Sequence, residues 1–119
     1  MASNYAANLR DLEHFEEARS LLRKTMPIAR RVFGDKDIVL FRMIKIYAAA
    51  LYEDTGATLN DLHEAVTTLE ELEPTARRVL GGAHPLLGSI KRQLQAARTV
   101  LDAREVGENV VFVGRPRSS

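Results

Sequence analysis

Residues 27–35 read Pro-Ile-Ala-Arg-Arg-Val-Phe-Gly-Asp, and residues 74–82, which lie 47 positions later, read Pro-Thr-Ala-Arg-Arg-Val-Leu-Gly-Gly. The match continues upstream, where the same shift aligns Leu22 with Leu69. Self-similarity at a fixed period of roughly 20–50 residues is the mark of a repeat architecture. Each unit of such a protein buries its apolar face only by packing on its neighbours. The stretch therefore predicts stacked repeats.

Apolar residues recur three and four positions apart along most of the chain, which is the spacing of one face of an α-helix. This spacing predicts five helices, each with one face that must pack. Their apolar positions are Tyr5, Leu9 and Leu12; then Ala18, Leu21, Leu22, Thr25, Ile28, Ala29 and Val32; then Leu40, Met43, Ile44, Tyr47, Ala48 and Leu51; then Leu62, Ala65, Val66, Leu69, Leu72, Ala76 and Val79; then Leu87, Ile90, Leu94, Ala97 and Leu101.

The residues at the expected helix starts are good capping residues. Asp35 or Asp37 is placed to cap the third helix, because a short side-chain oxygen accepts a hydrogen bond from a free N–H of the first turn. Thr58 and Asp61 have the spacing of a capping box before the fourth helix. Pro85 suits the first position of the fifth helix, where its missing N–H costs nothing.

Glycines and prolines mark two further features of the expected helices. Gly34 and Gly81 can adopt a positive φ angle, so we expect them to end the second and fourth helices. Pro27 and Pro74 stand deep inside those helices, where each removes a backbone hydrogen bond. Each helix is then either kinked or broken in two. We favour the kink, because the apolar spacing continues in phase past both prolines.

Length and composition exclude several classes of protein. The 119 residues suit one domain, and 17 basic against 16 acidic residues give a formal net charge of +1. Nucleic-acid binders usually show a strong basic excess. The absence of cysteine excludes disulfides, thiol catalysis and thiolate metal sites. No signal peptide and no run of about 18 apolar residues is present. We therefore expect a cytoplasmic protein without a nucleic-acid or membrane partner.

No local motif indicates catalysis or metal binding. His63-Glu64 begins like the zinc motif H-E-x-x-H, but Thr67 stands where the second histidine belongs. His14, His63 and His84 lack ligand spacing, and we expect His84 to cap the fifth helix instead. Neither a G-x-S-x-G elbow nor a phosphate-binding loop occurs. We therefore expect no enzymatic activity, no metal and no cofactor.

Two segments resemble tetratricopeptide repeats. Asn8-Leu9 followed by Phe15-Glu16-Glu17-Ala18 resembles the turn between the two helices of a repeat. Residues 79–85, Val-Leu-Gly-Gly-Ala-His-Pro, resemble the V-L-G-x-x-H-P junction of kinesin-light-chain-type repeats. The resemblance covers roughly residues 4–104. It implies an all-α fold in which antiparallel helix pairs stack as a short right-handed α-solenoid of about five helices.

The C-terminal segment departs from the repeat pattern. We expect a repeat domain over residues 1–105 and a tail over residues 106–119 that is extended or disordered. Asn109–Val113 is a β-prone run within that tail, and the last six residues are typical of a flexible end.

The resemblance also implies where a partner binds. In tetratricopeptide arrays the first helix of each pair lines a concave groove that holds a peptide or helix of another protein. The polar and aromatic residues expected in that groove are Asn4, Asn8, Arg42, Lys45, Tyr52, Lys91, Gln95 and Arg98.

The repeated arginine pairs allow two interpretations. Arg30-Arg31 and Arg77-Arg78 stand in the last turns of their helices, where the helix dipole favours a cation. They can equally stack one repeat apart as a basic ridge that binds carboxylates or phosphates. The function predicted overall is a protein–protein interaction module. The alternative is an assembly subunit that forms homo-oligomers or docks in a larger complex through its repeat ends and tail.

Overall fold

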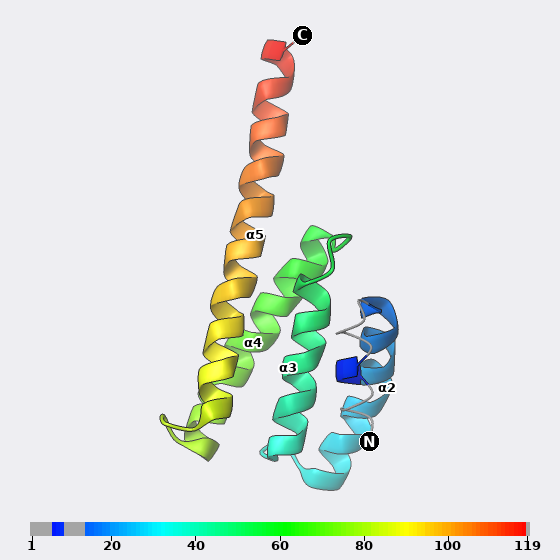
Figure 1. Cartoon of the computed structure of the whole chain (residues 1–119), viewed down its shortest axis with the longest axis vertical. Helices are drawn as coiled ribbons and strands as arrows, with labels where there is room; N and C mark the ends of the chain where they lie inside the picture. Colours follow the sequence, from blue (N-terminus) through cyan, green and yellow to red (C-terminus); the bar gives the residue numbers. More distant parts are fainter. Residues whose placement is uncertain (1–5, 9–13, 119) are drawn as a thin grey trace.

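The computed structural model describes residues 6–8 and 14–118, with side chains up to residue 107. The described part of the chain is all-helical, as the sequence predicts, and residues 6–8 are themselves helical. Tyr5, Leu9 and Leu12, which define the first expected helix, lie outside the described residues. Four further helices follow in order (Figure 1): α2 (Phe15–Phe33), α3 (Ile38–Tyr52), α4 (Leu59–Leu80) and α5 (Pro85–Ser118).

Glycines end α2 and α4 as predicted. Gly34 has φ 90° and Gly81 has φ 88°, values that residues with a side chain rarely adopt. The N–H of Gly34 donates to the carbonyl of Arg30 at 2.8 Å, and the N–H of Gly81 donates to that of Arg77 at 2.9 Å. Both repeats therefore turn out of their second helix at the same aligned position.

Side chains cap the starts of the next helices, also as predicted. The Asp37 carboxylate accepts a hydrogen bond at 2.8 Å from the N–H two residues on. Thr58 and Asp61 form a complete capping box, with reciprocal bonds of 3.1 and 3.0 Å. His84 caps α5, because its Nδ1 accepts at 3.0 Å from the N–H of Leu86, the second residue of that helix. Each cap pairs an N–H that the helix itself leaves free.

The two internal prolines do not break their helices. α2 runs through Pro27 and α4 runs through Pro74 without interruption. Both prolines are exposed, so the carbonyl that each leaves without a helical partner can be hydrated. The interpretation that each helix breaks in two at its proline is therefore wrong.

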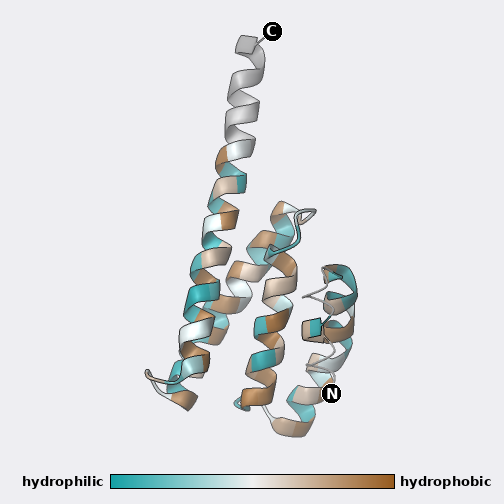
Figure 2. Ribbon diagram, viewed as in Figure 1, coloured by the Kyte–Doolittle hydropathy of each residue, from teal (hydrophilic) through white to brown (hydrophobic). Residues whose placement is uncertain are grey.

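α3 is the central helix of the fold. It packs against α2, α4 and α5, whereas α2 and α4 make no close backbone contact within the described residues. Ala48, Ala49 and Ala50 are all fully buried. Successive helical positions point about 100° apart, so these three small residues show that α3 is enclosed on most of its circumference. Figure 2 shows apolar residues distributed along all four helices, as this shared core requires.

The apolar face predicted for α2 is only partly buried. Ala18, Leu22 and Ala29 belong to the core, but Ile28 is 50% exposed and Val32 is 69% exposed. The prediction that Ile28 and Val32 pack is therefore wrong for the described part of the chain. The two residues lie one turn apart, so their exposed surfaces share one side of α2.

α5 is much longer than the other helices. Its backbone continues through residues 106–118, where the sequence predicts an extended or disordered tail, and it includes the β-prone run Asn109–Val113. An α-helix satisfies its backbone hydrogen bonds within one segment, so it can project beyond its neighbours without a partner strand. Figure 1 shows this projection beyond α3 and α4. The domain boundary after residue 105 stays a prediction.

Two arginines hold the long turn between α3 and α4. Arg19 of α2 donates to the carbonyl of Ala50 and to the Asp54 carboxylate, both at 3.2 Å. Arg104 of α5 donates to the carbonyl of Ala57 at 2.6 Å. The turn is therefore tied to the helices on both sides of it.

The capping box of α4 makes a first prediction. Replacing Thr58 with alanine removes one side-chain partner of the first turn, so the free energy of unfolding should fall by about 1 kcal/mol. Thr67→Ala makes the same chemical change at an exposed position inside α4 and should be neutral or slightly stabilising. Urea denaturation of both variants measures the difference, and equal effects would contradict the prediction.

Candidate functional site

One face of α3 carries three of the residues expected in the groove. Arg42 is exposed, whereas Lys45 and Tyr52 are half-buried. The side-chain amide of Gln93 on α5 contacts Lys45 on α3 through both of its polar atoms. In the orientation that satisfies both atoms, its nitrogen donates to the Lys45 carbonyl at 3.2 Å and its oxygen accepts from Lys45 Nζ at 3.3 Å. This bridge places α3 and α5 side by side on this face. Tyr52 lies near the long turn, beside a hollow of about 440 Å³ that Val100 of α5 also lines.

The expected groove residues of α5 lie on a different face. The 47-residue shift matches Lys91, Gln95 and Arg98 with three residues of α3 that pack in the core, which are Ile44, Ala48 and Leu51. On α5 these positions are exposed, and Arg98 forms an ion pair with Glu70 of α4 at 2.8 Å. These three polar positions provide no apolar surface on which a further helix could pack.

The same shift points to two residues that the sequence analysis did not place in the groove. Arg42 and Lys45 of α3 correspond to Ser89 and Arg92 of α5. α3 and α5 pack side by side, and we group these four residues by their matched repeat positions under the name α3–α5 face. The signal was present in the sequence, since the internal repeat that aligns the arginine pairs also aligns these positions.

The N-terminal pair of expected groove residues is only partly placed. Asn8 is exposed, and Asn4 lies outside the described residues. The structure therefore brings Arg42 and Lys45 together with α5, separates Lys91, Gln95 and Arg98 from them, and leaves the contribution of Asn4 a prediction.

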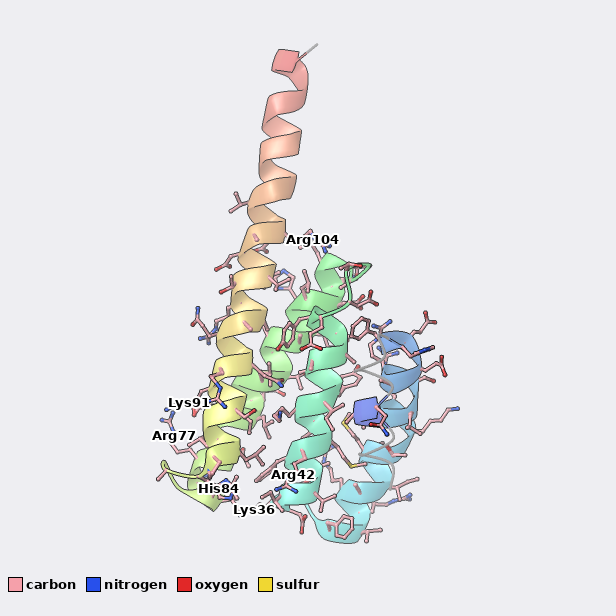
Figure 3. All side chains as sticks on the ribbon, in the orientation of Figure 1. Lys36, Arg42, Arg77, His84, Lys91 and Arg104 are labelled. Carbon is pink, nitrogen blue, oxygen red and sulfur yellow. The ribbon has the colours of Figure 1, made fainter. Side chains whose placement is uncertain are left out.

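The repeated arginines lie at the end of the molecule that carries the turns at residues 34–37 and 81–84. Arg30 pairs with Asp35 at 2.8 Å, and Arg77 pairs with Glu73 at 2.6 Å. Figure 3 shows labelled basic residues of α3, α4, α5 and both turns at this end. The cations here that have no carboxylate partner within the described part of the chain are Arg31, Lys36, Arg42, Arg78, Lys91 and Arg92.

This end of the molecule is therefore more basic than the net charge of +1 suggests. Its carboxylates are already engaged, because Asp35 and Glu73 form ion pairs and Asp37 caps α3. We name this region the basic end. The arginines sit in the last turns of α2 and α4 and share one end of the fold, and both interpretations of the arginine pairs stay predictions.

The opposite side of α3 forms the floor of a larger hollow. Leu40, Ile44 and Tyr47 of α3 line it, between α2 on one side and α4 on the other. Its volume is about 590 Å³. Helical geometry directs these positions away from Arg42 and Lys45, so the hollow and the α3–α5 face lie on different sides of the fold.

Three polar side chains connect α2 to α4 at one end of this hollow. Arg23 Nε of α2 donates to the Tyr47 hydroxyl at 3.1 Å, and that hydroxyl donates to the Glu64 carboxylate of α4. The ring of Tyr47 is buried, as the sequence predicts. Because α2 and α4 make no close backbone contact, this three-residue link spans a gap that α3 alone would leave open.

Burial raises the pKa of the Tyr47 hydroxyl above its usual value, and the hydrogen bond to Glu64 raises it further. Arg23 acts in the opposite direction, because a nearby cation favours the phenolate. The folded protein therefore holds Tyr47 in its neutral form more strongly than the unfolded chain does.

Other kinds of site find no support within the described residues. No group of three or more histidine, aspartate or glutamate side chains gathers there in a way that fits a metal ion. None of the helices described combines the length and the apolarity needed to cross a bilayer.

The Tyr47 link predicts how stability depends on pH. The raised pKa means that the unfolded chain loses this proton first, so the free energy of unfolding is intact below about pH 10 and falls as the pH rises toward the folded pKa. Tyr47→Phe should make that fall smaller. At neutral pH it should cost about 1 kcal/mol or less, because Arg23 and Glu64 stay hydrated.

Urea denaturation at a series of pH values, followed by circular dichroism, measures both effects. Tyr52→Phe is the control, because Tyr52 lies outside the link. Equal pH dependence of the wild type and Tyr47→Phe would contradict the prediction.

Comparison with known proteins gives one match. A family model described as a tetratricopeptide repeat matches residues 1–38, a stretch that includes α2 and the turn after it. No curated protein and no solved structure matches the chain significantly. The matched repeat is typically non-catalytic, and no enzyme family was found. The N-terminal third of the chain is therefore similar to a tetratricopeptide repeat of the kinesin-light-chain type, a repeat that serves generally as a protein–protein interaction module.

Proposed function

We propose that this chain is a cytoplasmic, non-catalytic interaction module that binds a peptide or helix of another protein on its α3–α5 face. The tetratricopeptide match supports protein binding in general. The observation that carries the finer proposal is the pairing of cationic residues across two adjacent first helices, Arg42 and Lys45 on α3 with Arg92 on α5.

The charge of this surface favours an acidic partner segment. Arg42 and Arg92 have no carboxylate partner within the described residues, so a partner can supply one without breaking an existing ion pair. The basic end, with Arg31 and Lys36, adjoins the start of α3 and extends the positive potential beyond the direct contacts. Arginine also binds carboxylates through two parallel hydrogen bonds, which adds geometric selectivity.

Charge reversal on the α3–α5 face tests the proposal. Peptides selected from a random displayed library on the wild-type chain should be enriched in aspartate and glutamate. The double variant Arg42→Glu, Arg92→Glu should bind those peptides about tenfold more weakly or worse, because two attractive charge pairs become repulsive. Fluorescence anisotropy measures the affinity.

Lys24→Glu is the matched control. Lys24 is exposed on α2, away from the α3–α5 face, and it also changes from a cation to an anion. It should bind as the wild type does. Selected peptides without acidic enrichment, or equal affinity for the wild type and the double variant, would rule out the α3–α5 face.

Self-association is a second candidate function, and one observation favours it. Ile28 and Val32 expose 50% and 69% of their surface on one side of α2. Adjacent exposed aliphatic residues on one helix side are typical of a surface that a second helix covers. An assembly subunit would use such a surface to pair with a second copy or with a larger complex.

Light scattering over a wide concentration range tests this candidate. The mass of the wild-type chain should rise with concentration, and Ile28→Lys with Val32→Lys should remain monomeric, because burying a lysine without a partner is costly. Val106→Lys is the control, since Val106 is a similarly exposed valine on α5. A truncation after Glu105 separates the contribution of the C-terminal segment. A wild-type monomer at every concentration would exclude self-association.

A further inference from the structure

The proposed function does not use the hollow between α2 and α4. Three consecutive helices build it: Met26 lies on the α2 wall, Phe41 and Ile44 on the α3 floor, and Leu72 on the α4 wall. Its volume of about 590 Å³ is within the range of roughly 300–1,000 Å³ that is usual for ligand pockets.

The hollow exists because small residues stand where α4 faces α2. Thr68 and Thr75 line the α4 wall, one turn away from Leu72 on either side. The link through Tyr47 closes one end, and the Arg30–Asp35 ion pair lies at the other. The two walls are therefore linked to each other at the Tyr47 end of the hollow.

The surface inside the hollow is mainly apolar. Met26, Ile44 and Leu72 present carbon and sulfur atoms to it, and Thr68 and Thr75 also line it. Ile44 and Met26 are only half-buried, so they keep apolar surface in contact with water. Covering that surface with another apolar side chain is favourable, at about 25 cal/mol per Å².

One charge at the hollow is not neutralised by a neighbour. Arg30 pairs with Asp35, and Glu64 accepts from Tyr47, but Glu71 has no partner within the described residues. Glu71 lies in the middle of the α4 wall, between the two threonines. Arg78 of the last turn of α4 donates to the Thr75 hydroxyl at 3.5 Å.

We propose that this hollow is a second docking site, which receives a large apolar side chain from a peptide segment of a partner protein, with an arginine or lysine beside that side chain. The apolar floor holds the anchor, and Glu71 pairs with the adjacent cation. The site lies on the opposite side of α3 from the α3–α5 face. It selects the opposite charge, so it is independent of the proposed binding of an acidic segment.

The experiment uses three small probes on the full chain. Acetyl-Phe-Arg-amide carries both features, acetyl-Ala-Arg-amide lacks the anchor, and acetyl-Phe-Glu-amide reverses the charge. Methyl NMR signals of Met26, Ile44 and Leu72 report on the hollow. The first probe should shift them saturably, with a dissociation constant on the order of 1 mM. The alanine probe should leave them unchanged, and the glutamate probe should bind about two- to fivefold more weakly.

Matched variants locate the site. Thr68→Leu and Thr75→Leu each place extra bulk in the hollow and should weaken binding of acetyl-Phe-Arg-amide at least about tenfold. Thr67→Leu makes the same change on the exposed side of α4 and should bind as the wild type does. Glu71→Gln should remove the preference for arginine over glutamate while keeping the anchor.

The outcomes separate the two proposals. The Arg42→Glu, Arg92→Glu variant should bind acetyl-Phe-Arg-amide normally, even if it loses acidic peptides. No saturable shift in the wild type, or equal binding by Thr67→Leu and both filled variants, would overturn the docking site. An unchanged preference for arginine in Glu71→Gln would overturn the assignment of the cation to Glu71.

Discussion

The enclosure of α3 by its three neighbours is the constraint on which the rest of the molecule depends. Ala48, Ala49 and Ala50 are fully buried at successive positions, so other helices approach α3 closely from several directions. The small side chains make that approach sterically easy. Only parts of α3 remain accessible to solvent, and both proposed sites use them. One part carries Arg42 and Lys45 toward α5, and the other forms the floor between α2 and α4.

The fold was largely predictable because its signals are local. Helical spacing, positive-φ glycines and capping side chains act within a few residues, and Asp37, Thr58 and His84 behave as that chemistry predicts. The exposure of Ile28 and Val32 was not predictable, since the apolar spacing of a helix does not say whether a neighbour covers the whole face. The hollow was not predictable either, because it depends on side-chain sizes on two helices that make no close backbone contact.

The candidate site was predictable only in part. The resemblance to tetratricopeptide repeats indicated that α3 carries binding residues. The internal repeat, applied to those residues of α3, indicates Ser89 and Arg92 as the matching positions on α5. Composition was less informative, because a net charge of +1 hides how the charges are arranged. Glu16 and Glu17 begin α2, whereas the arginines gather in its last turn, so one helix already separates the two signs along its length.

The different character of α2 and α5 limits the ways in which copies of this chain can associate. The side of α2 with Ile28 and Val32 is apolar, whereas the face of α5 with Lys91, Gln95 and Arg98 is charged or polar. Head-to-tail stacking would bring the apolar side of α2 of one copy against the polar face of α5 of the next copy. It would desolvate the polar groups of α5 without giving them hydrogen-bonding partners. Such heterologous contacts are the ones that grow into open filaments. The polar face of α5 therefore acts against polymerisation, and it favours closed, symmetric assemblies wherever the apolar side of α2 is covered.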